Sequence, residues 1–178
     1  MKLLDPKARD NDRGAVMVES LVAIPTLMTF IAALIQLCEL SMASLVVQHA
    51  SVVAARSASV IVPDLPTAFE PVSAVGDATG GRLDTITDAA NKVIASLEPI
   101  RGFNVNTNFN KSATVTLMND GIPASSFSSK DVIQAKVAYD FNCQIGFGAS
   151  LIVCGLPGKI TITAISAMPN QGAGYGYD

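Results

Sequence analysis

The sequence predicts an α+β fold, in which a long N-terminal helix, first transmembrane and then amphipathic, packs on a small antiparallel sheet with one further helix. One change of period supports this fold class. Apolar residues recur at helical spacing before residue 63 and again from 83 to 100, and after residue 101 they alternate with polar residues as in a strand. The expected parts are a basic leader at 1–14, a long helix at 15–62, a linker at 63–82 and a head domain at 83–178.

Composition indicates a membrane segment and argues against nucleic-acid binding. The 178 residues are 49% hydrophobic and 15% charged, and the apolar excess lies mainly between residues 15 and 62. The net charge is -3, and no basic cluster occurs beyond the leader. The chain has no Trp and three Tyr, so it offers no platform for stacking bases. We therefore expect no nucleic-acid partner.

The segment from Ser20 to Cys38 carries no charge and is long enough to span a bilayer. As a helix, its ~19 residues would cover roughly 28 Å, against a hydrocarbon core of roughly 30 Å. Lysine and arginine are concentrated in the leader, whereas Arg56 alone follows the segment within about 20 residues. The positive-inside rule therefore predicts a single-pass protein with its N-terminus in the cytoplasm and its C-terminal domain outside, in the periplasm if the cell has two membranes.

Pro25 lies inside this apolar segment. A proline removes one backbone hydrogen bond and bends a helix, and membrane helices tolerate the defect when neighbours supply partners. We therefore predict a helix kink at Pro25. It is compatible with a monomeric anchor and equally with a use in assembly.

No proline or glycine interrupts the chain from Glu39 to Val62, so the helix is expected to continue into water until Pro63 stops it. The other faces of this segment still hold large apolar side chains among many Ala and Ser, and such a helix must be covered on more than one side. The head domain can cover one face, and other subunits or a partner would cover the rest. The face expected to pack on the head domain comprises Leu40, Ala43, Val47, Ala50, Ala54, Ala58 and Ile61.

The head domain is expected to begin with an amphipathic helix from Leu83 to Ile100, with Asp84 as its N-cap and Pro99 at its end. Asn119-Asp120-Gly121 and the serines after it predict a loop, and the glycine-rich end of the chain predicts a mobile tail. The expected strands are Phe103–Phe109, Ala113–Met118, Val132–Phe141 and Lys159–Ala167.

Cys143 and Cys154 form a close pair, whereas Cys38 lies in the apolar segment. In an exported domain such a pair predicts one disulfide that closes a small loop, and in a cytosolic protein it would more often be two free thiols. The predicted topology favours the disulfide.

Enzyme and metal motifs are poorly represented. His49, the single histidine, falls in the middle of the long helix, where a Ser-His-Asp or Cys-His arrangement would have to be built on a rod. Cys38 and His49 lack the clustered spacing of a zinc site. The glycine-rich segments do not lie between a predicted strand and a predicted helix, which is the context that a phosphate-binding loop requires. We therefore expect no enzyme activity, no cofactor and no metal.

Glu19 is the one carboxylate at the start of the apolar segment. Carrying it to the bilayer centre would cost several kcal/mol, so it needs either water or a positive partner. It can simply lie at the headgroup level near a helix N-terminus. Alternatively, a cut between Gly14 and Ala15 would create an α-ammonium about one turn away from Glu19.

These residues resemble a known family. Gly14, a small residue after it and Glu19 at the fifth place of an uncharged helix resemble the class III signal of type IV prepilins. The Arg13-Gly14-Ala15 sequence, the Val18-Glu19 pair, Pro25, Glu39 and the alanine-rich run ending at Arg56 are similar to the TadE-like pseudopilins of tight-adherence (Flp-type) pili. The last strands match that family loosely. One departure is Ser20, where the family usually has an aromatic residue, and it bears on packing and on recognition by the peptidase.

The resemblance implies a minor pseudopilin with a pilin-like helix, processed by a prepilin peptidase and delivered from the inner membrane to a pilus at the cell surface. Its partners would be that peptidase, other pilin or pseudopilin subunits and the inner-membrane assembly platform. A rival hypothesis is an unprocessed, signal-anchored periplasmic adhesion or binding domain. A neighbouring gene set with a prepilin peptidase and a secretion ATPase would separate the two.

Overall fold

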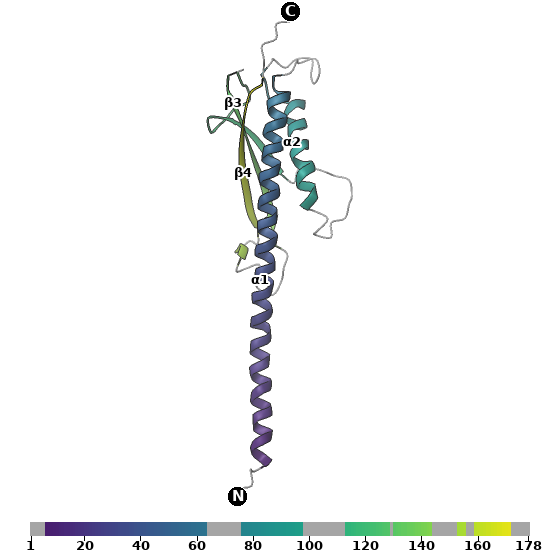
Figure 1. Ribbon diagram of the computed structural model, residues 1–178, viewed down its shortest axis with the longest axis vertical. Coiled ribbons are helices and arrows are strands. Elements are labelled where there is room, and N and C mark those ends of the chain that lie inside the picture. Colours follow the sequence, from purple (N-terminus) through teal and green to yellow (C-terminus); the bar gives the residue numbers. More distant parts are fainter. Residues whose placement is uncertain are drawn as a thin grey trace, which may run out of the picture. The chain divides into compact units, whose positions relative to one another are not determined.

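The structure is a computed structural model, and its elements confirm the predicted α+β class (Figure 1). It describes residues 6–63, 76–97, 113–128, 130–143, 153–155 and 159–171, with the backbone alone for 6–16. The elements are α1 (Pro6–Ile61), α2 (Gly81–Ile94), the 3-10 turn η2 (Ala95–Leu97), β1 (Ala113–Asn119), β2 (Ile122–Pro123), β3 (Val132–Asn142) and β4 (Lys159–Pro169).

The chain divides into two compact units. The first contains Met1–Glu39 and Asn142–Lys159, and the second contains Leu40–Phe141 and Ile160–Asp178. Helix α1 contributes to both. It begins at Pro6, so residues 6–14 of the expected leader are already helical.

Helix α1 is continuous through Pro25. Threonines near the proline bond back to the helix, since Thr29 Oγ1 donates to the Pro25 carbonyl at 2.8 Å and Thr26 Oγ1 donates to the Val22 carbonyl at 2.9 Å. Threonine hydroxyls within a helix commonly donate such a hydrogen bond to the carbonyl one turn earlier. The predicted kink at Pro25 stays a prediction.

The second unit contains the sheet, whose strand order is β2-β1-β3-β4. Strands β1 and β3 pair in antiparallel register from Ala113 opposite Tyr139 to Asn119 opposite Ile133. The predicted strands at 113–118, 132–141 and 159–167 are confirmed within two residues at each end. The predicted strand Phe103–Phe109 and the tail from residue 172 lie outside the described residues.

The predicted loop after β1 is a two-residue hairpin turn into the short strand β2. Asp120 and Gly121 both have positive φ, 49° and 82°, which a type I′ turn requires and which Asp-Gly favours. The Asp-Gly pair was visible in the sequence, but β2 is too short to show any alternation of its own.

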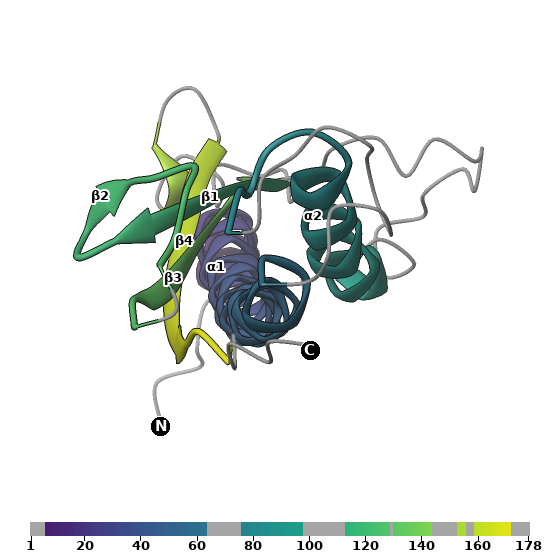
Figure 2. The same cartoon turned by 90° about the horizontal axis from the view of Figure 1, so that it is seen from above.

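The part of α1 in the second unit runs beside the sheet and α2 (Figures 1 and 2). Helix α2 also contacts the start of β1, where the Ala113 N–H donates to Asn91 Oδ1 at 3.3 Å. Five residues of the predicted packing face, Ala43, Val47, Ala50, Ala54 and Ala58, are fully buried, and the two at its ends are half-buried. A second row of α1 is also buried, and the sequence pattern did not distinguish this row from the exposed faces. Its residues are Ser51, Ala55, Ser59 and Val62. Small side chains on both rows let α1 approach its neighbours closely.

Helix α2 begins earlier than expected, and the prediction of Asp84 as its N-cap is wrong. The N-cap is Gly80, with φ 58° and no side-chain cap, and Asp84 lies in the first turn with its N–H donating to the Gly80 carbonyl at 3.1 Å. A glycine adopts this positive φ without the steric cost that a side chain brings. Pro99, the expected end of the helix, lies outside the described residues.

The end of the expected linker belongs to the second unit. Asp77 forms a β-bridge with Ser126, the Ala78 N–H donates to the Ser125 carbonyl at 2.7 Å, and the Phe127 N–H donates to the Gly76 carbonyl at 2.8 Å. Residues 76–78 are therefore hydrogen-bonded to residues 125–127 through the backbone, as one strand is to another. Residues 64–75 lie outside the described residues.

Candidate membrane and assembly surface

The N-terminal part of α1 presents large apolar side chains on all sides. Within the part of the chain that the structure describes, Met17–Ile61 is the one helix long and apolar enough to cross a membrane, with a mean hydropathy of 2.2 and 6% of its most apolar window buried. Leu21 is 75% exposed and Phe30 is 61% exposed. The core helix of a soluble protein would be mostly buried, and this one is not. The helix is thus a candidate membrane anchor.

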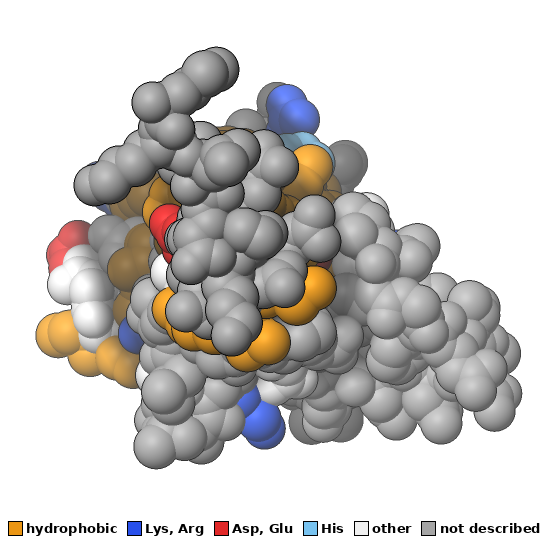
Figure 3. Space-filling model, turned by 90° about the horizontal axis from the view of Figure 1, so that it is seen from below, with side chains coloured by type: hydrophobic (Ala, Val, Ile, Leu, Met, Phe, Trp, Pro, Cys, Tyr) orange, Lys and Arg blue, Asp and Glu red, His pale blue; other side chains and the backbone are white. Residues whose placement is uncertain are grey.

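Glu19 lies at the N-terminal end of one apolar face of this helix. Its side chain is exposed and borders a shallow hollow along the helix surface. The other residues of this face, three and four positions apart, are Val22, Ala23, Thr26, Leu27 and Phe30. A view from the N-terminal end of α1 shows hydrophobic side chains around this part of the molecule (Figure 3). A carboxylate is thus presented beside a surface that a second apolar helix can cover.

Gly14 and Ala15 are placed by backbone alone, within α1. Ala15 and Glu19 are four residues apart on one helix, so their α-carbons differ by one turn, or about 6 Å of rise. An α-ammonium on Ala15 would therefore lie near the Glu19 carboxylate of its own chain. It could pair with that carboxylate or with the Glu19 carboxylate of a neighbouring chain. Cleavage between Gly14 and Ala15 stays a prediction.

The second half of α1 keeps several large apolar side chains in solvent. Met42 is 54% exposed, Leu45 is 66% exposed and Val60 is 58% exposed, although two rows of the same helix are buried in the second unit. The expectation that one head domain covers only part of this helix is met. His49 and Arg56 are exposed on the same side of the helix, so this surface mixes apolar and polar side chains.

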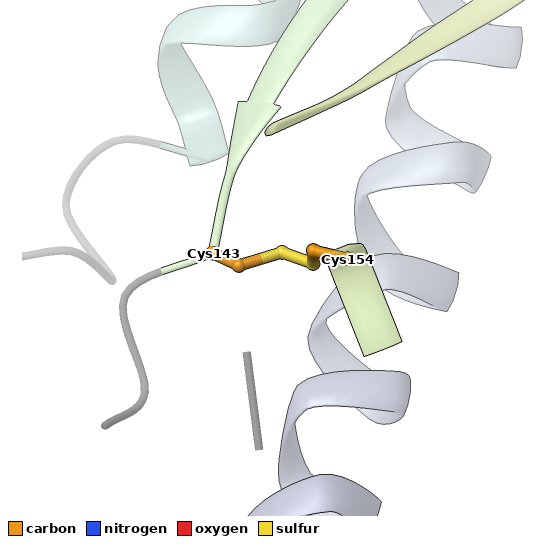
Figure 4. The surroundings of a disulfide bond; sticks show 2 residues. All are labelled: Cys143 and Cys154. Carbon is orange, nitrogen blue, oxygen red and sulfur yellow. A yellow bond between two sulfur atoms is a disulfide. The ribbon is translucent and has the colours of Figure 1, made fainter. Parts of the chain in front are cut away.

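Cys143 and Cys154 form the predicted disulfide, which closes the loop between β3 and β4 (Figure 4). The two cysteines are 11 positions apart in the sequence. Their α-carbons are 6.4 Å apart, within the usual range for a disulfide. Cys38 is free and exposed. Among the described residues no three His, Cys, Asp or Glu side chains gather as a metal site, and His49 is exposed on α1.

Arg82 is the structurally important residue that the sequence reasoning missed. It is completely buried, and its Nη1 donates to the Val62 carbonyl at 3.2 Å and to the Asp77 carbonyl at 2.9 Å. The Val62 carbonyl also accepts the Gly76 N–H at 3.1 Å. A buried guanidinium thus caps the C-terminal end of α1, where the helix macrodipole favours a cation.

Comparison of the chain with protein-family models, curated proteins and solved structures found no match. The functional argument therefore depends on the residues and the geometry of this chain.

Proposed function

We propose that this protein is a minor pseudopilin, or another structural subunit, of a tight-adherence type IV-like pilus. A prepilin peptidase cuts between Gly14 and Ala15, and α1 holds the subunit in the inner membrane with the second unit in the periplasm. The subunit then enters a filament through α1. The observation that supports this function best is the exposure pattern of α1. This helix has an exposed apolar segment long enough to cross a membrane, and it continues into a domain that covers only two of its rows.

The assembly step has a physical rationale in Glu19. Apolar helices that pack side by side exclude water, so a carboxylate among them requires a positive partner. Cleavage supplies that partner, because it creates an α-ammonium on Ala15 of each chain. An incoming subunit would place its own ammonium against the Glu19 carboxylate of a neighbour, and the pair would fix the axial position of the two helices.

The first test is the N-terminal mass of the membrane-extracted full-length protein. Intact mass and N-terminal sequencing should show loss of Met1–Gly14, and cells that lack the peptidase should retain the uncleaved chain. A chain that keeps its leader in cells with an active peptidase would refute the proposal. It would instead support an anchored periplasmic adhesion or binding domain, which the separate core of the second unit also suits.

The second test replaces Glu19 with alanine. Cleavage should stay normal, because the peptidase site lies before it, and incorporation into filaments should fail. Glu39→Ala is the matched control, since it removes a carboxylate from the same helix beyond the charge-free segment. Sheared filaments quantified by immunoblot give the measurement. Equal incorporation of Glu19→Ala and wild-type subunits would eliminate the charge-pairing role.

A further inference from the structure

Five exposed residues on the α1 part of the second unit form a seam with a period of about 3.5 residues. Their spacings along the helix are three, four, three and four, and the residues are Met42, Leu45, His49, Val52 and Arg56. Leu45 is 66% exposed and Met42 is 54% exposed. A seam of this period is the pattern by which one helix packs along another at a crossing angle of about 20°. The seam therefore fits a helical partner.

The seam follows the one side of this part of α1 that the second unit leaves open. The rows that contain Val47 and Ser51 are buried. The other exposed residues from 41 to 60 lie within about 60° of Leu45 around the helix axis, and they are Ser41, Gln48 and Val60. A single helix can cover a side of this width.

The charges of the seam specify the chemistry of that helix. His49 and Arg56 are seven positions apart, so they occupy the same position of two successive heptads. Among the described residues, the Arg56 guanidinium forms no ion pair. A helix that covers the seam takes both bases out of water, and a buried cation needs a carboxylate opposite it. The covering helix therefore has to bring carboxylates at the same spacing of seven positions.

A second copy packed seam against seam does not meet this need. In a parallel pair in register, Arg56 would face Arg56 and His49 would face His49. In an antiparallel pair, the same bases would face apolar residues of the seam. From residue 40 to 61 the helix contains no Asp or Glu, so neither arrangement brings a carboxylate to Arg56. Such a seam selects against its own copy and for a helix of opposite charge.

We propose that the seam binds an acidic amphipathic helix of a different protein chain. Leu45 and Val52 pack between apolar side chains of that helix, and two of its carboxylates accept hydrogen bonds from His49 and Arg56. The inference rests on the proposed function for taking the partner to be another subunit of the filament. The seam and its charges do not depend on the leader or on its cleavage.

The test uses two synthetic helical peptides and the detergent-solubilised full chain with Cys38→Ser. Each peptide has leucines along its own seam; the acidic peptide has glutamates at two seam positions seven residues apart, and the basic peptide has lysines there. Fluorescence anisotropy should show that the acidic peptide binds at least about 10-fold more tightly. The net charge of the chain is -3, so non-specific attraction would favour the basic peptide instead. Equal binding of the two peptides, or binding of neither, would overturn the proposal.

Charge reversal locates the contact. Arg56→Glu should reverse the preference, so that the basic peptide binds more tightly than the acidic one. Lys92→Glu is the matched control, because it makes the same change of charge at an exposed position of α2 and should leave the preference as it is. The same response from both variants would show an effect of net charge alone and would contradict the seam.

The apolar part of the seam has its own matched pair. Leu45→Ser should weaken binding of the acidic peptide about 10-fold, because the leucine side chain no longer contributes apolar burial. Ile122→Ser should leave binding unchanged, since Ile122 is a similarly exposed apolar residue, at 70%, in β2. Equal losses in the two variants would overturn the proposal.

Val52→Cys in the same Cys38→Ser background tests the second copy as the occupant. Under mild oxidation the chain should stay monomeric, and efficient formation of disulfide-linked dimers would show that a copy covers the seam. The N-terminal mass separates this inference from the proposed function. Loss of the leader without preference for the acidic peptide overturns the seam alone, whereas an uncleaved chain that prefers the acidic peptide overturns the pilus function alone.

Discussion

Arg82 holds the end of α1 to the segment that precedes α2, and its replacement by methionine tests this link. Its guanidinium is fully buried and donates to the carbonyls of Val62 and Asp77. Methionine has a similar length and no donor, so Arg82→Met removes the hydrogen bonds while leaving most of the packing. Two buried carbonyls then lose a charged donor at the C-terminal end of the helix.

The expected cost follows from these contacts. A hydrogen bond to a charged group contributes about 1.5–3 kcal/mol, and a cation at a helix C-terminus adds about 0.3–1 kcal/mol or more when partly buried. Removal of a buried charge also recovers its desolvation cost, which places the net loss near the lower end. We expect Arg82→Met to lower the free energy of unfolding of the second unit by about 3 kcal/mol, or its Tm by roughly 10 °C.

The measurement is urea unfolding of the detergent-solubilised full chain. It is followed by the near-UV circular dichroism of Tyr139, which is buried in β3. Arg56→Met is the control, because Arg56 is exposed on α1, and its loss should change stability by no more than about 0.5 kcal/mol. Arg82→Lys keeps the charge without the fork and should fall between the two. If Arg82→Met unfolds at the same urea concentration as Arg56→Met, the guanidinium does not hold the end of α1.

The same unfolding assay tests three further variants. Gly76→Ala should cost more than Gly121→Ala: both glycines have positive φ, but a Cβ at Gly76 would collide with the Phe127 carbonyl, whereas at Gly121 nothing lies within 4 Å. We expect about 1 kcal/mol at Gly121 and at least twice that at Gly76, and equal losses would contradict the packing argument. The double change Cys143→Ser and Cys154→Ser should cost about 3 kcal/mol by loss of the loop constraint on the unfolded chain. Unchanged unfolding together with a peptide map that shows free thiols in the wild type would disprove the pairing.

The sequence was sufficient to predict the long helix, its buried alanine face and three of the strands. In each of these elements, apolar side chains recur at a regular spacing along the chain. Ala43, Val47 and Ala50 mark the packing face by spacing alone, and the strand at 132–141 alternates along its whole length. Burial of one face leaves a signal in the sequence whenever the element is long enough for the pattern to recur.

The remaining features depend on contacts between residues far apart in sequence. Arg82 follows a glycine-rich segment and gives no local indication that it will be buried against Val62, twenty residues earlier. The N-cap at Gly80 could not be distinguished from Asp84, because aspartate is the more usual cap and only the backbone angle favours glycine here. A shallow groove on the second unit brings Leu40 and Leu45 of α1 beside Ile160 of β4, more than a hundred positions later in the sequence. Such features arise from topology and not from periodicity.

The exposure of α1 is compatible with the proposed function, in which this helix moves from the bilayer into a filament. A permanent anchor needs an apolar segment only across the hydrocarbon, although single exposed apolar side chains are common on any domain. In this chain the apolar exposure continues past Cys38 to Met42, Leu45 and Val60, on a part of α1 whose other rows are already buried in the second unit. Under the proposed function, other subunits would cover Met42, Leu45 and Val60 once the helix has left the bilayer, and the exposed His49 and Arg56 on the same side would need polar partners in the filament.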